Sequence, residues 1–184
     1  MKRFAMMVSG LAAALMISVA VAEELKSGLA VGDAPGAFNV NDVTGPSKGK
    51  SLCYRCQYGN RPVVAVFARD VNDDLAKVIK DVDGIVEKNK DKKMAAFVVV
   101  LSEDADKLAP KLEELAKKNG IKNVPLTTFD GAAGPEDYNI SKDADVTVLM
   151  WNKSEVKANV ALAKGGLDAK AAKKIVAEAE KLAN

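Results

Sequence analysis

The sequence contains no histidine among its 184 residues, only two cysteines and a single tryptophan. The lack of histidine excludes Ser-His-Asp and Cys-His catalysis, zinc sites that use imidazole, and haem attachment through a Cys-x-x-Cys-His motif. Two cysteines also fall short of the four nitrogen or sulfur ligands of a typical structural zinc site. We therefore expect no cofactor and no resident metal ion. Reduced cysteines would still suit Cu(I), or a four-sulfur site shared by two copies.

An excess of charge of one sign is also missing. The chain has 27 lysines and arginines against 25 aspartates and glutamates. Lys2 and Arg3 fall in an N-terminal segment, residues 1–22, that contains no acidic residue, so the remaining chain is balanced in charge. Because nucleic-acid binding relies on a surplus of basic side chains, we expect no nucleic-acid partner.

The N-terminal segment is typical of a secretory signal peptide. Two basic residues precede an apolar run over residues 4–21, and Ala20-Val21-Ala22 offers the small side chains that signal peptidase reads. An uncleaved membrane anchor is the alternative, because the run approaches the length that spans a bilayer. We expect residues 23–184 to form one domain that is secreted or periplasmic, with no membrane association after cleavage. Disulfides persist in those compartments.

Several short stretches predict β-strands. Alternating apolar and polar residues over 38–43 indicate a half-buried strand, and a second short strand is expected over 50–54. The apolar runs 62–68 and 94–101 are too short for helices and indicate strands that are covered on both faces. A helix between these two runs would make them a parallel pair through a right-handed crossover.

Three helices are expected from apolar residues spaced three and four apart. The first begins at Asn72 or Asp73, and the second has a regular part that begins near Pro110 and ends at Asn119-Gly120. The third is capped by Asp168. This alternation of strands and helices predicts an α/β fold.

The second half of the domain should close the sheet. A short strand is expected over 124–129, followed by a loop over 130–137 that is rich in glycine and alanine. Residues 146–151 and 155–162 flank a polar turn and predict a β-hairpin.

This order of elements resembles the thioredoxin-like superfamily, in its peroxiredoxin and secreted-redoxin branch. Val31-Gly-Asp-Ala-Pro35 and Asp42-Val-Thr-Gly45 are similar to the opening of redoxin domains, and residues 147–160 look like the closing hairpin of that fold. The resemblance spans nearly all of residues 23–184. It implies a three-layer α/β/α sandwich with a mixed central sheet and an N-terminal β-hairpin extension.

Two positions depart from that family. Its reactive cysteine lies just past the first buried parallel strand, where backbone amides lower the thiol pKa. Here residues 68–74 contain no cysteine and three aspartates. The family's cis-proline position matches Val146. Pro125 is a rival match, but it would make the hairpin predicted over residues 146–162 an extra element of the fold. A thiol peroxidase conflicts with the missing cysteine.

The remaining chemical motif is Cys53-Tyr54-Arg55-Cys56. The resemblance invites a redox role in which one cysteine attacks the disulfide of a partner protein and the other resolves the mixed disulfide. Arg55 would stabilise a thiolate. Because the motif precedes the first buried strand, we expect it near the opposite end of the sheet from the usual site.

Two hypotheses therefore stay open for this pair. In the first, Cys53 and Cys56 are the catalytic residues of an exported thiol-disulfide oxidoreductase, with a protein thiol or disulfide as partner. In the second, they form a disulfide that staples the N-terminal hairpin of a non-catalytic binding or structural protein. The sequence predicts no particular oligomeric state.

Overall fold

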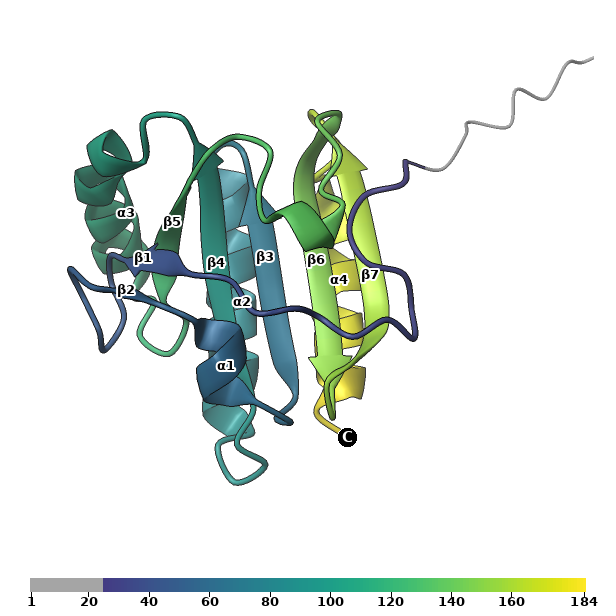
Figure 1. The fold of residues 1–184 in the computed structure, drawn as a ribbon. Helices are drawn as coiled ribbons and strands as arrows, with labels where there is room; N and C mark the ends of the chain where they lie inside the picture. The colour runs from purple at the N-terminus through teal and green to yellow at the C-terminus, as the bar shows by residue number, and fades with distance from the viewer. Residues whose placement is uncertain (1–24) are drawn as a thin grey trace, which may run out of the picture.

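The computed structural model describes residues 25–184, so the predicted signal peptide of residues 1–22 lies outside the described residues. The described chain forms one mixed sheet of seven strands (Figure 1). The strands are β1 (Val40–Asp42), β2 (Ser51–Leu52), β3 (Val63–Ala68), β4 (Ala95–Ser102), β5 (Leu126–Asp130), β6 (Ala144–Asn152) and β7 (Glu155–Ala163). They lie in the order β2-β1-β5-β4-β3-β6-β7. The predicted α/β architecture and N-terminal hairpin are both present.

The central strands have the predicted geometry. β3 is parallel to β4, and β4 is parallel to β5. Every residue of β3 is buried, and β4 is buried as far as Leu101. Burial on both faces explains why these strands are continuous apolar runs rather than alternating ones.

The closing hairpin is also confirmed. β6 is antiparallel to both β3 and β7. Lys153 and Ser154 in the turn have φ of 54° and 61°. Two successive residues in the left-handed region are typical of a type I′ turn, whose twist matches that of the strands it joins.

Three long helices cover one face of the sheet: α2 (Asp73–Lys88), α3 (Ala105–Asn119) and α4 (Ala169–Leu182). Their apolar sides form one core with Val64, Val66 and Ala68 of β3. Figure 1 shows α2 and α4 behind the sheet. No helix among residues 25–184 has both the length and the apolarity needed to cross a bilayer.

The predicted helix ends are largely correct. Asn72 accepts a hydrogen bond from the Leu75 amide at 2.9 Å, and Asp168 accepts one from the Ala171 amide at 2.7 Å. Gly120 ends α3 in the left-handed conformation, with φ of 62°. These contacts satisfy amides and carbonyls that a helix leaves unpaired at its ends.

The predicted start of α3 near Pro110 is wrong, because the helix already begins at Ala105. Pro110 is exposed, so its ring projects into solvent, and a proline inside a helix removes one backbone hydrogen bond. Ala105 is buried and Leu108 packs on the core, which offsets that loss over the first turns.

The other face of the sheet is covered by the N-terminal segment, the short helix α1 (Tyr54–Tyr58) and a 3-10 turn, η1 (Glu136–Tyr138). Figure 1 shows α1 in front of the sheet. The core on this side is aromatic, and it includes Tyr54, Phe67, Phe97, Tyr138 and Trp151.

The strand predicted over residues 50–54 is shorter than expected, since β2 ends at Leu52 and Tyr54 begins α1. Tyr54 is 1% exposed, and its burial turns the chain inward at this point. The two cysteines consequently lie at a helical turn rather than in the hairpin.

Candidate functional site

Cys53 and Cys56 are joined by a disulfide, with their Cα atoms 5.2 Å apart. Cys53 is the N-cap of α1, and Cys56 lies within the helix. The bridge therefore closes one helical turn and does not connect β1 to β2, so a staple across the hairpin is wrong. With both sulfurs in the bridge, neither is a thiolate ligand for Cu(I) in this state.

The two sulfurs have different surroundings. Cys56 is exposed, whereas Cys53 is half-buried. The backbone amide of Cys56 donates a hydrogen bond to Cys53 Sγ at 3.0 Å. One cysteine is thus open to solvent, and the sulfur of the other accepts a hydrogen bond.

Tyr54, between the cysteines, fixes the helix to the core. Its ring stacks on Phe97 and Tyr58, with ring centroids 5.6 Å and 5.2 Å away. Its hydroxyl donates a hydrogen bond to Asp42 Oδ2 at 2.8 Å. Aromatic packing and a charge-assisted hydrogen bond together hold α1 in place.

Asp42 is itself almost fully buried, at 3% exposed. Its carboxylate also accepts hydrogen bonds from the Gly45 amide at 2.7 Å and the Ser47 amide at 2.8 Å. A buried carboxylate is tolerated because these donors replace water. Asp42 therefore links the β1–β2 loop to the helix that carries the cysteines.

Burial raises the pKa of Tyr54 far above that of a free tyrosine, and its hydrogen bond to the Asp42 carboxylate raises the pKa further. The pKa of Tyr58 is also raised, first by burial and then by the charge of Asp42, although nearby Arg61 lowers it. Tyr54 consequently stays protonated and remains a hydrogen-bond donor across the physiological pH range.

Arg55 has a different role from the one the sequence suggests. Its Nε donates to the Pro35 carbonyl at 2.9 Å, and its Nη2 donates to Ser154 Oγ at 3.1 Å. Ser154 Oγ in turn donates to Asn60 Oδ1 at 2.7 Å. The guanidinium thus ties α1 to the N-terminal segment and the β6–β7 turn, and the donor that reaches a sulfur is the Cys56 amide.

These contacts place the cysteines at the amino ends of the parallel strands. The Lys153 amide donates to the Asn60 carbonyl, and Val63 at the start of β3 pairs with Trp151. The carboxyl ends of β3, β4 and β5 lie at the opposite edge, away from α1 in Figure 1. The predicted displacement of the pair from the usual redoxin site is confirmed.

Arg69 occupies the carboxyl end of β3, where the resemblance would place a reactive cysteine. Its guanidinium donates to the carbonyls of Ala144 and Ser141, each at 2.9 Å, and to that of Ala132. Two loop carbonyls and the carbonyl of the first residue of β6 therefore converge on one cation. Arg69 therefore has a structural role at this end of the sheet.

Val146 is placed as the sequence predicts, opposite Ala68 on β3. It lies inside β6, which begins at Ala144, two residues before the predicted strand over 146–151. The rival position, Pro125, comes immediately before β5, which is a parallel partner of β4. Pro125 therefore does not match the position that faces β3. Every peptide bond in residues 25–184 is trans.

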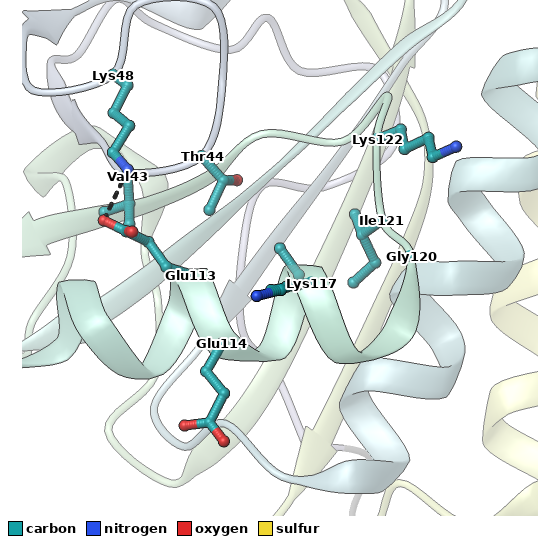
Figure 2. Close-up of a pocket in the computed structure, with 10 residues that line it drawn as sticks. Val43, Thr44, Lys48, Glu113, Glu114, Lys117, Gly120, Ile121 and Lys122 are labelled. Atoms are coloured by element: carbon teal, nitrogen blue, oxygen red, sulfur yellow. Dashed lines mark ion pairs between the residues drawn. The ribbon is translucent and has the colours of Figure 1, made fainter.

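A hollow of about 710 Å³ lies between α3 and the β1–β2 loop (Figure 2). Its floor is apolar and includes Val43 and Ile121, and its rim is charged. Lys48 and Glu113 form an ion pair of 2.9 Å across the rim. Val43 and Ile121 belong to the core beneath α2–α4, whereas Tyr54 belongs to the core on the other face. The hollow is therefore separate from the cysteine pair.

Sequence reasoning found the two cysteines but missed the residues that hold them, Asp42 and Ser154. Asp42 had a usable signal, because an aspartate followed three residues later by glycine is typical of a turn in which the carboxylate caps backbone amides. Ser154 is distant in sequence, and nothing in the local pattern links it to Arg55.

No protein-family model matches this sequence. No curated protein matches it either. Solved structures do match, and those described here do so at low sequence identity. A candidate protein disulfide isomerase from Bacteroides thetaiotaomicron has a TM-score of 0.62 at 15% identity, covering 86% of this chain and 94% of that one.

Two further structures have the same architecture. A candidate thiol:disulfide interchange protein DsbE from Chlorobium tepidum has a TM-score of 0.58 at 13% identity, covering 83% of this chain and 99% of that one. The peroxidoxin BcpB from Mycobacterium tuberculosis has a TM-score of 0.57 at 15% identity, with 82% and 96% covered. Likeness at such identity establishes architecture alone. The chain has the thioredoxin-like fold of the redoxins, with its Cys-x-x-Cys disulfide on α1.

Proposed function

We propose that this protein is an exported thiol-disulfide oxidoreductase whose Cys53–Cys56 pair exchanges with a thiol or disulfide of a partner protein. The observation that carries the proposal is a disulfide with one exposed residue, Cys56, on a helix anchored by Tyr54. Access is a requirement for exchange, and anchoring holds the helix in place during exchange. Two of the solved structures with this fold carry names of disulfide-exchange proteins, which favours the same chemistry.

The size of the disulfide loop argues against a purely stabilising bridge. A bond between residues three apart removes little conformational freedom from the unfolded chain, so the expected gain is only about 2 kcal/mol. The buried Tyr54 and its bond to Asp42 already hold the helix. A stabilising role would gain more from a longer loop.

A non-catalytic binding protein is the second candidate. It is favoured by Arg69, which is bonded to backbone carbonyls at the end of the sheet where redoxins usually hold their reactive cysteine. On that account the thioredoxin-like scaffold serves for binding or assembly, and the disulfide stays oxidised without exchange.

The cellular location of the protein is also proposed. With residues 1–22 removed by signal peptidase, the domain would work in the periplasm or outside the cell, where a dithiol can cycle against oxidised partners. The mass of the exported protein tests this, since cleavage after Ala22 leaves Glu23 as the first residue. Retention of the full chain in the membrane would contradict it.

Turnover of a peptide disulfide tests the proposed activity. Residues 23–184 should accelerate the reduction of a fluorescently quenched peptide disulfide by dithiothreitol, because the helix presents Cys56 to solvent. The matched control is the Cys53→Ser/Cys56→Ser double variant, in which the introduced hydroxyl at position 53 still provides an N-cap oxygen for α1. Equal rates for the two proteins would leave the binding protein as the better account.

A further inference from the structure

We infer that the sulfur which bonds to the partner is that of Cys56, and that Cys53 is the leaving and resolving cysteine. This inference rests on the proposed function, and it deepens that function by assigning different roles to two chemically identical side chains. It is carried by the geometry of the turn that contains them.

The first argument is access. Cys56 is exposed and Cys53 is half-buried at the start of α1. The segment before Cys53 is held by the pairing of β2 with β1, while the buried ring of Tyr54 follows directly. A thiolate carried by a folded partner therefore reaches Cys56 Sγ more easily than Cys53 Sγ.

The second argument is the stability of the leaving group. When a disulfide sulfur is attacked, the other sulfur departs as a thiolate, and departure is faster when that thiol has a lower pKa. The Cys56 amide donates to Cys53 Sγ at 3.0 Å, which stabilises negative charge on that sulfur. No comparable donor reaches Cys56 Sγ among the hydrogen bonds of residues 25–184.

The two steps balance as follows. A thiolate of a partner dithiol attacks Cys56 Sγ, the Cys53–Cys56 bond breaks, and Cys53 leaves as a thiolate with the electron pair of that bond. The partner's second thiolate then attacks the partner's first sulfur, which is bonded to Cys56 in the mixed disulfide, and Cys56 leaves as a thiolate with the electron pair of that bond. The two protons that the partner thiols lose pass through solvent to the Cys53 and Cys56 thiolates. The partner dithiol is oxidised to a disulfide and Cys53–Cys56 is reduced to two thiols. In the reverse direction Cys56 attacks the partner disulfide and Cys53 resolves the intermediate.

Trapping with a monothiol tests this assignment. Oxidised protein, residues 23–184, is mixed with excess reduced glutathione, quenched in acid, alkylated and mapped by tandem mass spectrometry. We expect the glutathione adduct on Cys56 to exceed that on Cys53 by roughly tenfold or more, because access and leaving-group stability act in the same direction. The same mixture in denaturing guanidinium chloride is the control, and there the two adducts should become nearly equal.

Equal adducts in the folded protein, or a majority on Cys53, would overturn the assignment and leave the proposed function intact. If no adduct and no free thiol form at any glutathione concentration, exchange itself is absent and both proposals fail.

A matched pair of variants measures the leaving-group argument separately. Cys56→Ser leaves Cys53 with the same backbone donor, and Cys53→Ser leaves Cys56 alone. The rate of alkylation by iodoacetamide is measured as a function of pH. The pH at the midpoint of the curve should be lower for Cys53 in the first variant than for Cys56 in the second. The reverse order would contradict the role of the amide, while a midpoint shift in the expected direction supports it.

Discussion

Tyr54→Ala lowers the free energy of unfolding by about 4–6 kcal/mol, the largest loss that we expect from a single substitution near the cysteines. The change removes a ring that is 1% exposed and packs on Phe97, and it leaves the buried Asp42 carboxylate without one of its donors. A cavity and an unsatisfied charge both destabilise the folded state. Equilibrium unfolding in urea measures the effect.

Tyr54→Phe separates the two contributions and guards against a variant that fails to fold. It keeps the ring in place and removes only the hydroxyl that bonds to Asp42. A hydrogen bond to a charged group is worth about 1.5–3 kcal/mol, so the phenylalanine variant should lose that much and no more. If Tyr54→Ala lowered the free energy of unfolding by less than about 1 kcal/mol, the ring would not anchor α1. That result would contradict the stabilisation expected from its burial.

Arg69→Ala should lower the free energy of unfolding by about 2–3 kcal/mol and leave disulfide exchange unchanged. The guanidinium donates to three carbonyls, those of Ala132, Ser141 and Ala144, and its removal takes one donor from each, although the Ser141 carbonyl keeps its hydrogen bond from the Ala144 amide at 3.2 Å. The carbonyls of Ala132 and Ser141 lie between β5 and β6, and Ala144 is the first residue of β6. All three meet Arg69 just past the carboxyl end of β3, at the end of the sheet away from α1 (Figure 1). Urea unfolding and the peptide reduction assay measure the two quantities on the same sample.

Arg69→Lys is the matched control, because an ammonium keeps the charge but lacks the planar fork that reaches several acceptors. We expect it to restore less than half of the lost stability. Loss of exchange activity in Arg69→Ala at a temperature where the variant is folded would show that the usual redoxin edge takes part in the chemistry.

Hydrophobic periodicity was sufficient to predict most of the fold. The runs at β3 and β4 and the spacing in α2 are long enough to carry a clear strand or helix pattern, and the hairpin around Lys153 has a strong turn signal. The order of strands and helices along the chain then reduced the number of possible sheet topologies, because crossovers between parallel strands are right-handed.

The helix that carries the two cysteines, α1, was harder to predict. Helix α1 has only five residues, which is too few for a helical period to emerge beside the short strand β2. Its position depends on Tyr54 meeting Asp42 and on Arg55 meeting Ser154, contacts that join distant parts of the chain. The hydrogen bonds of Arg69 likewise could not be predicted, because their acceptors are backbone carbonyls, which every residue has.

Pro110 is an example of a local signal that tertiary packing overrides. Proline normally marks the first turn of a helix, yet here it lies inside α3 on the exposed side. Burial of Ala105 favours a start five residues earlier than the local rule predicts.

The reduction potential of the Cys53–Cys56 disulfide tests the central claim most directly. Residues 23–184 are equilibrated in glutathione buffers of varied ratio, and free thiols are counted by mass after alkylation. We predict that both thiols appear together, with a midpoint above about −300 mV, the range of bridges that exchange in cells. A disulfide that stays closed until well below that potential, or that opens only when the protein unfolds, would contradict the proposed exchange.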